Sequence, residues 1–121
     1  MNFLFVAFGG ALGAVARYAI SLIPVKTGFP IHTLITNIVG AVLIGFIVGF
    51  TDNRDGISEN VVLFWKTGVC GGFTTFSTFS LDAWYLIERG QTVASAVYMI
   101  ASVVLSVGAL IAALHVVRAF P

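Results

Sequence analysis

Hydrophobic residues run along the chain in four long stretches that are separated by short polar or proline-containing segments. The stretches cover about 3–23, 33–51, 61–87 and 92–119. A helix needs about 20 mostly apolar residues to cross the hydrocarbon part of a membrane, and every stretch is close to that length or longer. We therefore predict an all-α membrane protein with four transmembrane helices, which form a single transmembrane domain over 1–121.

The third stretch is too long for a straight membrane helix. Its roughly 27 residues would reach about 40 Å at a rise of 1.5 Å per residue, against a hydrocarbon thickness of about 30 Å. Tilt would absorb part of this excess. A break near Gly71–Thr75 would absorb it too, and the glycines and hydroxyls of Gly71–Ser80 favour the break. Non-helical backbone at that depth must be buried in protein or line a water-filled cavity.

The composition identifies lipid as the main solvent of this chain. Hydrophobic residues make up 59% and charged residues only 9%, whereas soluble proteins carry about 25% charged residues. The net charge of +1 excludes an electrostatic nucleic-acid binder. No Cys/His cluster, phosphate-binding loop or nucleophile–base pair is present, so we expect neither an enzyme nor an ATP-driven pump. The predicted location is the cell membrane, with no soluble partner implied.

The positive charges are divided equally between the two ends of the predicted helices. Three lie on the side of the N-terminus and three on the opposite side, namely Arg54, Lys66 and Arg118 against Arg17, Lys26 and Arg89. Lys26 and Lys66 are interpreted as anchors at the membrane surface. Because Lys and Arg set orientation, this balance favours neither direction of insertion. It arises by chance in a small protein, or it indicates that copies insert both ways up and pair antiparallel.

Three polar side chains inside the predicted spans need partners. The amide of Asn37 either ties helices together or offers N–H donors to an anion. Arg17 and Asp82 lie near the same membrane face, and we expect them at matching depth, where they form an ion pair. Alternatively, Arg17 snorkels to the surface or raises the anion concentration in an aqueous vestibule.

Hydroxyls form a stripe on the last predicted helix. Their spacings of three and four residues place them on one face, occupied by Ser95, Tyr98, Ser102 and Ser106. A single serine in a membrane helix often only bonds its own backbone. A stripe that crosses much of the bilayer instead predicts one wall of a polar path.

Two phenylalanines share a face near the middle of the third stretch. Phe76 and Phe79 are three residues apart and are interleaved with threonine and serine, so their face is not purely lipid-facing. The edge of an aromatic ring carries partial positive charge and coordinates an anion weakly. Weak coordination suits conduction, because the ion must be able to leave. Elsewhere, the pairs Gly9/Gly13 and Gly45/Gly49 predict close helix packing.

These motifs resemble the Fluc/CrcB family of small fluoride channels over essentially the whole chain. The resemblance rests on Gly9–Ala14 leading to Arg17-Tyr18, on Thr36–Gly40, and above all on Gly71–Ser80. It implies a dual-topology antiparallel homodimer that exports fluoride passively through pores at the dimer interface. One departure is Asp82, which stands where family members often carry glutamate.

The resemblance also implies roles for individual residues. Ring edges of Phe76 and Phe79 would line each pore, and the amide of Asn37 would act as donor. Hydroxyls would extend a polar track over Thr75, Ser77, Ser102 and Ser106, with Tyr98 nearby. A structural Na⁺ on the two-fold axis would be held by main-chain carbonyls at positions matching Gly71 and Thr74. Oxygen ligands suit such a hard cation.

Two other functions fit the length and the number of spans. A small multidrug exporter exchanges protons for cationic drugs and needs a buried glutamate in its first span, but residues 3–23 contain no acid. A structural or assembly protein would need no organised polar face, so the hydroxyl stripe is evidence against it.

Overall fold

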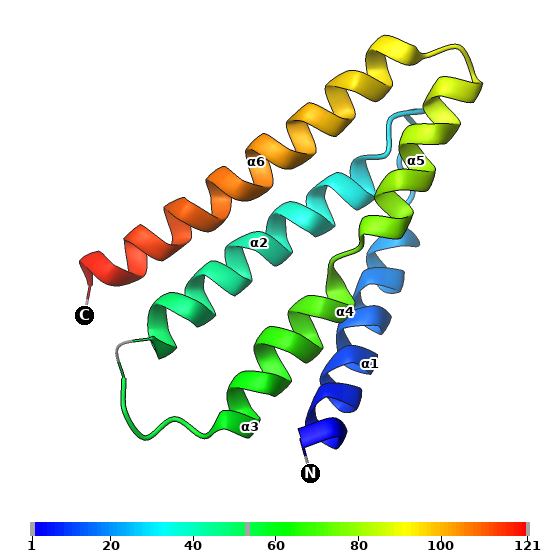
Figure 1. Cartoon of the computed structure of the whole chain (residues 1–121). Helices are drawn as coiled ribbons and strands as arrows, with labels where there is room; N and C mark the ends of the chain where they lie inside the picture. Colours follow the sequence, from blue (N-terminus) through cyan, green and yellow to red (C-terminus); the bar gives the residue numbers. More distant parts are fainter. Residues whose placement is uncertain (1, 53, 121) are drawn as a thin grey trace.

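The computed structural model describes residues 2–52 and 54–120, and these are helical almost throughout. Three long helices are apolar enough to cross a membrane: α1 (Asn2–Ser21), α2 (Ile31–Thr51) and α6 (Thr92–Ala119). The third predicted stretch is built from shorter pieces, α3 (Glu59–Val62), the π-helix η1 (Leu63–Cys70), α4 (Gly71–Phe73) and α5 (Phe76–Glu88) (Figure 1). No strand occurs in the described part of the chain, which confirms the all-α prediction.

The helices begin and end within two residues of the predicted stretches. Both termini lie toward the same end of the molecule, opposite the tight turn between α5 and α6 (Figure 1). Since α3 to α5 do not form one continuous helix, the crossing of the membrane by this segment stays a prediction.

The third segment is interrupted between Phe73 and Phe76, at the end of the predicted range. Thr74 has ψ 154° and Thr75 has φ −148° and ψ 125°, so both residues are extended. Helix α5 then restarts with Thr75 as its N-cap, whose hydroxyl accepts a hydrogen bond from the backbone N–H of Thr78 at 3.1 Å.

Helix α1 packs backbone to backbone against η1 and α4. A Cβ atom added at Gly9 would lie 2.9 Å from Cα of Gly68, and one at Gly13 would lie 2.7 Å from the backbone N of Phe73. At these distances only the hydrogen atoms of glycine fit, and a methyl group would overlap with the backbone of the neighbouring segment. The prediction that this glycine pair serves close helix packing is confirmed.

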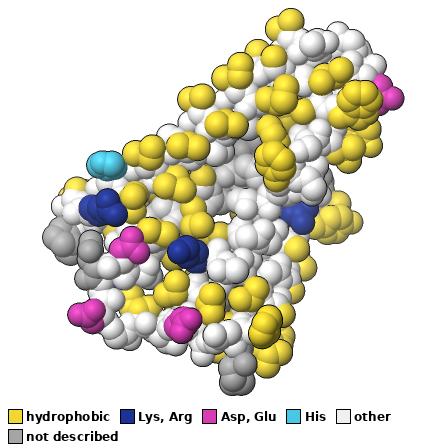
Figure 2. Space-filling view, viewed as in Figure 1, with side chains coloured by type: hydrophobic (Ala, Val, Ile, Leu, Met, Phe, Trp, Pro, Cys, Tyr) yellow, Lys and Arg dark blue, Asp and Glu magenta, His cyan; other side chains and the backbone are white. Residues whose placement is uncertain are grey.

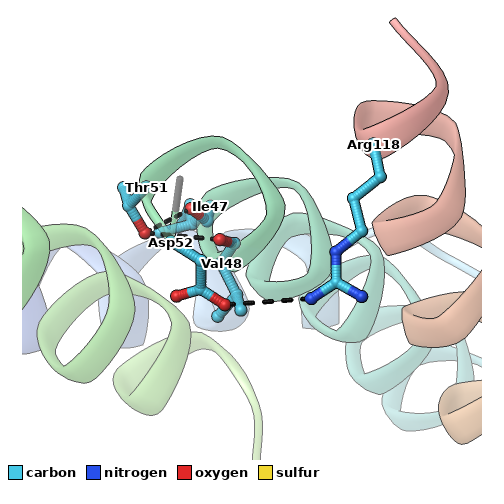
Figure 3. Close-up of polar contacts among 5 residues, drawn as sticks. All are labelled: Ile47, Val48, Thr51, Asp52 and Arg118. Carbon is cyan, nitrogen blue, oxygen red and sulfur yellow. Dashed lines mark hydrogen bonds and ion pairs between the residues drawn. The ribbon is translucent and has the colours of Figure 1, made fainter. Parts of the chain in front are cut away.

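Helices α2 and α6 lie side by side along most of their length (Figure 1). A Cβ at Gly45 would approach the carbonyl oxygen of Leu110 to 2.7 Å, so this pair of helices also packs closely. At the end of the pair, Arg118 approaches the carboxylate of Asp52 at 4.0 Å, with both side chains half-exposed (Figure 3). A surface pair of this kind contributes only about 0–1 kcal/mol.

A small core joins α5, α6 and the loop before α2. Its buried members are Ala83, Leu86 and Tyr98, and the partly buried Phe29, Leu34, Phe79 and Ala94 pack against them. Few other hydrophobic residues are buried. Many large hydrophobic side chains are exposed. In the view of Figure 2, most charged side chains lie toward the end that holds the two termini, and one acidic side chain lies at the opposite end. This distribution suits a protein whose sides face lipid.

The turn between α5 and α6 is a Schellman motif. The N–H of Gln91 donates to the carbonyl of Leu86 at 2.8 Å, and the N–H of Gly90 donates to that of Ile87 at 3.0 Å. Gly90 has φ +78°, a conformation that costs other residues free energy.

Gly90→Ala is therefore expected to lower the free energy of unfolding by about 1–2 kcal/mol, the cost of the left-handed conformation. Nothing lies within 4 Å of a Cβ at this position, so sterics do not contribute. Thermal unfolding in detergent measures the effect. Gly108→Ala is the matched control, because it also has open space but lies inside helix α6 with no positive φ.

Candidate functional site

A cavity of about 600 Å³ lies between α2, the interrupted third segment and α6. It contains most of the residues singled out from the sequence. From α2 comes Asn37, and the other predicted residues on its wall are Gly71, Thr74, Thr75, Phe76, Phe79, Ser102 and Ser106. Residues that are far apart in the chain therefore meet at the break in the third segment.

The amide of Asn37 holds the extended backbone of the break. Its Oδ1 accepts from the N–H of Thr75 at 2.9 Å, and its Nδ2 donates to the carbonyl of Thr75 at 3.2 Å. In a continuous helix, the N–H and the carbonyl of Thr75 would bond other backbone groups of that helix. The amide of Asn37 takes the place of these partners. Among the described residues, one N–H of the Nδ2 group has no acceptor, so the amide of Asn37 ties α2 to the break and keeps a second donor.

Two serine hydroxyls on α6 have no hydrogen-bond partner within the described residues. They belong to Ser102, which is 6% exposed, and to Ser106, and both residues line the cavity. A buried hydroxyl without a partner costs about 1–3 kcal/mol. Such a cost is accepted where water or a ligand supplies the missing bond.

The predicted hydroxyl stripe divides into two parts with different roles. Ser95 is buried and donates to the carbonyl of Ala83 at 2.8 Å, so it joins α6 to α5. Tyr98 is fully buried against the same helix. Only Ser102 and Ser106 reach the cavity, since α5 is short and covers only the first turns of α6. Of the four residues in the expected polar wall, Ser102 and Ser106 line this cavity, and the role of the wall in a polar path stays a prediction.

A row of aromatic rings leads from the core to the cavity. The ring centroids of Phe79 and Tyr98 are 5.2 Å apart, and those of Phe79 and Phe76 are 5.5 Å apart. Phe76 is 78% exposed at the open side of the cavity, while Phe79 is half-buried. Both predicted rings therefore lie on the cavity wall.

The expected ion pair between Arg17 and Asp82 is absent from the described residues. Nε of Arg17 donates to the carbonyl of Gly72 at 3.2 Å. The Asp82 carboxylate instead accepts from Thr33 at 2.7 Å and from Tyr98 at 3.3 Å. The break explains the difference. It leaves the carbonyl of Gly72 free to accept from the guanidinium of Arg17.

The break also leaves carbonyl groups available. The N–H of Thr75, which would bond Gly71 in a continuous helix, goes to Asn37. No donor reaches the carbonyls of Gly71 or Thr74 from the described part of the chain. Within that part, no cluster of His, Cys, Asp or Glu is suited to hold a metal, and the carbonyls at the break are oxygen ligands that a continuous helix would have used.

Four predicted residues do not line the cavity. They are Ser77, which is exposed and shares a hydroxyl contact with Thr75, and Arg17, Asp82 and Tyr98, whose partners are given above. Conversely, Lys66, Thr67 and Cys70 line it although we expected no such role. All three lie on η1. Lys66 and Thr67 precede Cys70 and Gly71 by four residues each, so helical spacing counted back from the break could have placed them on the same face.

Comparison with known proteins gives close relatives over nearly the whole chain. The family described as CrcB-like protein, Camphor Resistance (CrcB), matches residues 4–114. The chain is 53% identical over 120 residues to fluoride-specific ion channel FluC 1 of Nitrobacter hamburgensis, with 95% of this chain and 94% of that protein covered. It is 52% identical over 118 residues to fluoride-specific ion channel FluC of Nitrobacter winogradskyi, with the same coverage. The protein of that name from Granulibacter bethesdensis is 46% identical over 121 residues, covering 98% and 95%.

Proposed function

The chain belongs to the CrcB-like family, and on this premise we propose that it is a fluoride-selective channel that exports fluoride passively across the cell membrane. The relatives named above are fluoride-specific ion channels, which describes a transport protein and not an enzyme. The observation that carries the proposal is the pair of buried, unpartnered hydroxyls of Ser102 and Ser106 in the cavity.

Passive export suits the chemistry of fluoride. Hydrogen fluoride is a weak acid that crosses lipid as a neutral molecule and dissociates in a less acidic cell, where the anion is trapped. A pore lets the anion leave down its own gradient. No energy source is needed, which agrees with a sequence that has no phosphate-binding loop with a lysine.

Selectivity over chloride follows from the donors along the path. Fluoride is small and strongly hydrated, so the protein must replace much of its water shell. The hydroxyls of Ser102 and Ser106, the free N–H of Asn37 and the ring edges of Phe76 and Phe79 supply hydrogen atoms with partial positive charge. In the narrow path that a second copy would close, a larger anion would be excluded by size.

A second copy in the opposite orientation would complete the path. The cavity is open on the side where Phe76 is 78% exposed, and the described residues hold no further helix to close it. The equal division of positive charges allows both orientations. We therefore include an antiparallel homodimer with inverted topology in the proposal.

A structural Na⁺ fits the carbonyls at the break. Those of Gly71 and Thr74 have no donor within the described residues and line the face that would meet the second copy. When bound, the ion would neutralise these dipoles and hold the two interrupted segments together. No step of conduction requires it to move.

The alternative exporter gains no support. Helix α1 contains no acid, and the intramembrane carboxylate of Asp82 is already bound by Thr33 and Tyr98. A carboxylate that exchanges protons for a cationic drug must be accessible to both. The relatives are channels by name, which also argues against a purely structural role.

Purified protein in liposomes loaded with potassium fluoride is expected to release fluoride rapidly once a potassium ionophore is added. Liposomes loaded with chloride are expected to retain it over the same time, since the donors fit only the smaller ion. Ion-selective electrodes measure both. Equal release of chloride, or no release of fluoride, would contradict the proposal.

Two further experiments test the antiparallel dimer and the Na⁺ site. Cross-linking in native membranes should give a dimer, and exclusive recovery of monomer would contradict the antiparallel pair. Replacing Na⁺ by a large organic cation during purification should weaken the dimer, whereas an unchanged dimer would remove the ion from the proposal.

A further inference from the structure

One charged side chain stands on the cavity wall. Of the cavity-lining residues that the structure describes, Lys66 alone carries a formal charge. The ion pair found in residues 2–52 and 54–120 joins Asp52 to Arg118, so no described carboxylate neutralises Lys66. The expectation that Lys66 is only a surface anchor does not explain why it borders the cavity.

Helical spacing accounts for this position. Residues four apart lie on one face of a helix. Lys66, Cys70 and Thr74 are four apart, and all three line the cavity from the third segment. Lys66 thus lies about two turns before Thr74, on the way from the membrane surface to the break.

The surroundings of Lys66 strengthen its effect on an anion. Most of the remaining wall is apolar or carries neutral hydroxyls, with Ile44, Val103 and Leu110 among its members. Low-dielectric walls focus the field of a charge into the space between them and raise the local concentration of the opposite ion. The aliphatic stem of lysine can lie along such a wall while its ammonium stays hydrated.

We propose that Lys66 recruits fluoride into the cavity and passes it toward the hydroxyls of Ser102 and Ser106. This inference rests on the proposed channel function and assigns Lys66 a positioning role at the entrance. The ammonium attracts the anion while it is still hydrated, and the neutral donors replace the water afterwards. No carboxylate lines the wall to compete for the ammonium.

Initial fluoride release from liposomes tests the role through its dependence on salt. At about 10 mM ionic strength, where a charge acts over about 30 Å, Lys66→Gln is expected to lower the rate about tenfold. Lys66→Arg should keep most of the rate, and Lys66→Glu should lower it further than Lys66→Gln. At about 1 M of an impermeant salt, where screening acts within about 3 Å, the variants should approach the wild-type rate. Lys26→Gln is the matched control, since Lys26 does not line the cavity.

The outcomes separate this inference from the proposed function. If the wild type releases no fluoride, the channel function itself fails. If the wild type conducts but Lys66→Gln matches it at both salt concentrations, only the role of Lys66 is wrong. Should Lys66→Gln not fold, the wild type still decides: its rate must fall steeply as impermeant salt is added, and a salt-independent rate would refute recruitment by charge.

Discussion

Asn37→Ala is expected to abolish fluoride release and to lower the free energy of unfolding by about 2–6 kcal/mol. The amide of Asn37 bonds both the N–H and the carbonyl of Thr75. Its removal leaves two backbone groups without partners, at about 1–3 kcal/mol each. The extended conformation of the break, and with it the position of Phe76, would no longer be maintained.

Fluoride release from liposomes and thermal unfolding in detergent measure the two effects. Asn37→Asp keeps an acceptor for Thr75 but loses the donor and adds a negative charge, so it should also block fluoride. Ser80→Ala is the control, because the exposed hydroxyl of Ser80 only donates to the carbonyl of Phe76, four residues before it. Wild-type release by Asn37→Ala would show that the break does not depend on this amide.

Gly13→Ala is expected to prevent normal packing of α1 and to cost about 3 kcal/mol or more. The added methyl group would meet the carbonyl of Val69 and lie 2.7 Å from the backbone N of Phe73. Overpacking typically costs about 1–3 kcal/mol even when side chains can adjust. Here the neighbours are backbone atoms, which cannot rotate away. The usual helix preference for alanine, about 1 kcal/mol, does not offset this.

Gly10→Ala provides the matched control three residues earlier on the same helix. Its Cβ would lie 4.0 Å from the nearest atom, the carbonyl oxygen of Gly68, so there is room for a methyl group. This variant should be unchanged or up to about 1 kcal/mol more stable. Size-exclusion profiles and melting temperatures in detergent compare the two. Equal stability of Gly10→Ala and Gly13→Ala would contradict the backbone packing of α1 on η1 and α4.

The helices and the break were predictable because each depends on local composition. The lengths of the apolar stretches gave helix ends within two residues, since polar and proline residues end such helices wherever the chain folds. The excess length of the third stretch and its glycines located the interruption between Phe73 and Phe76. The membrane restricts backbone structure so strongly that these features need no knowledge of tertiary contacts.

The partners of the polar side chains were less predictable. Periodicity places Ser95 and Ser102 on one face of α6, but it does not reveal which helix covers each. Helix α5 covers Ser95, whereas Ser102 opens to the cavity. Likewise, equal depth suggested that Arg17 meets Asp82, although the guanidinium bonds a carbonyl that only the break releases.

The π-helix η1 was not predicted at all. Residues Leu63–Cys70 have no composition that distinguishes a π-helix from an α-helix. The cavity-facing position of Lys66 does not depend on that choice, because Lys66, Cys70 and Thr74 are four residues apart, as on one face of an ordinary helix. The structure adds that this face borders the cavity.

The free hydroxyls of Ser102 and Ser106 also bear on the direction of transport. Each O–H group can rotate about its C–O bond, so the same hydrogen can face an ion arriving from either end. Because these hydroxyls can rotate, they favour neither direction of transport. The flow of ions reverses whenever the driving force changes sign. The protein would then behave as an ohmic leak for a single ion, protective only while the anion is more concentrated inside than outside.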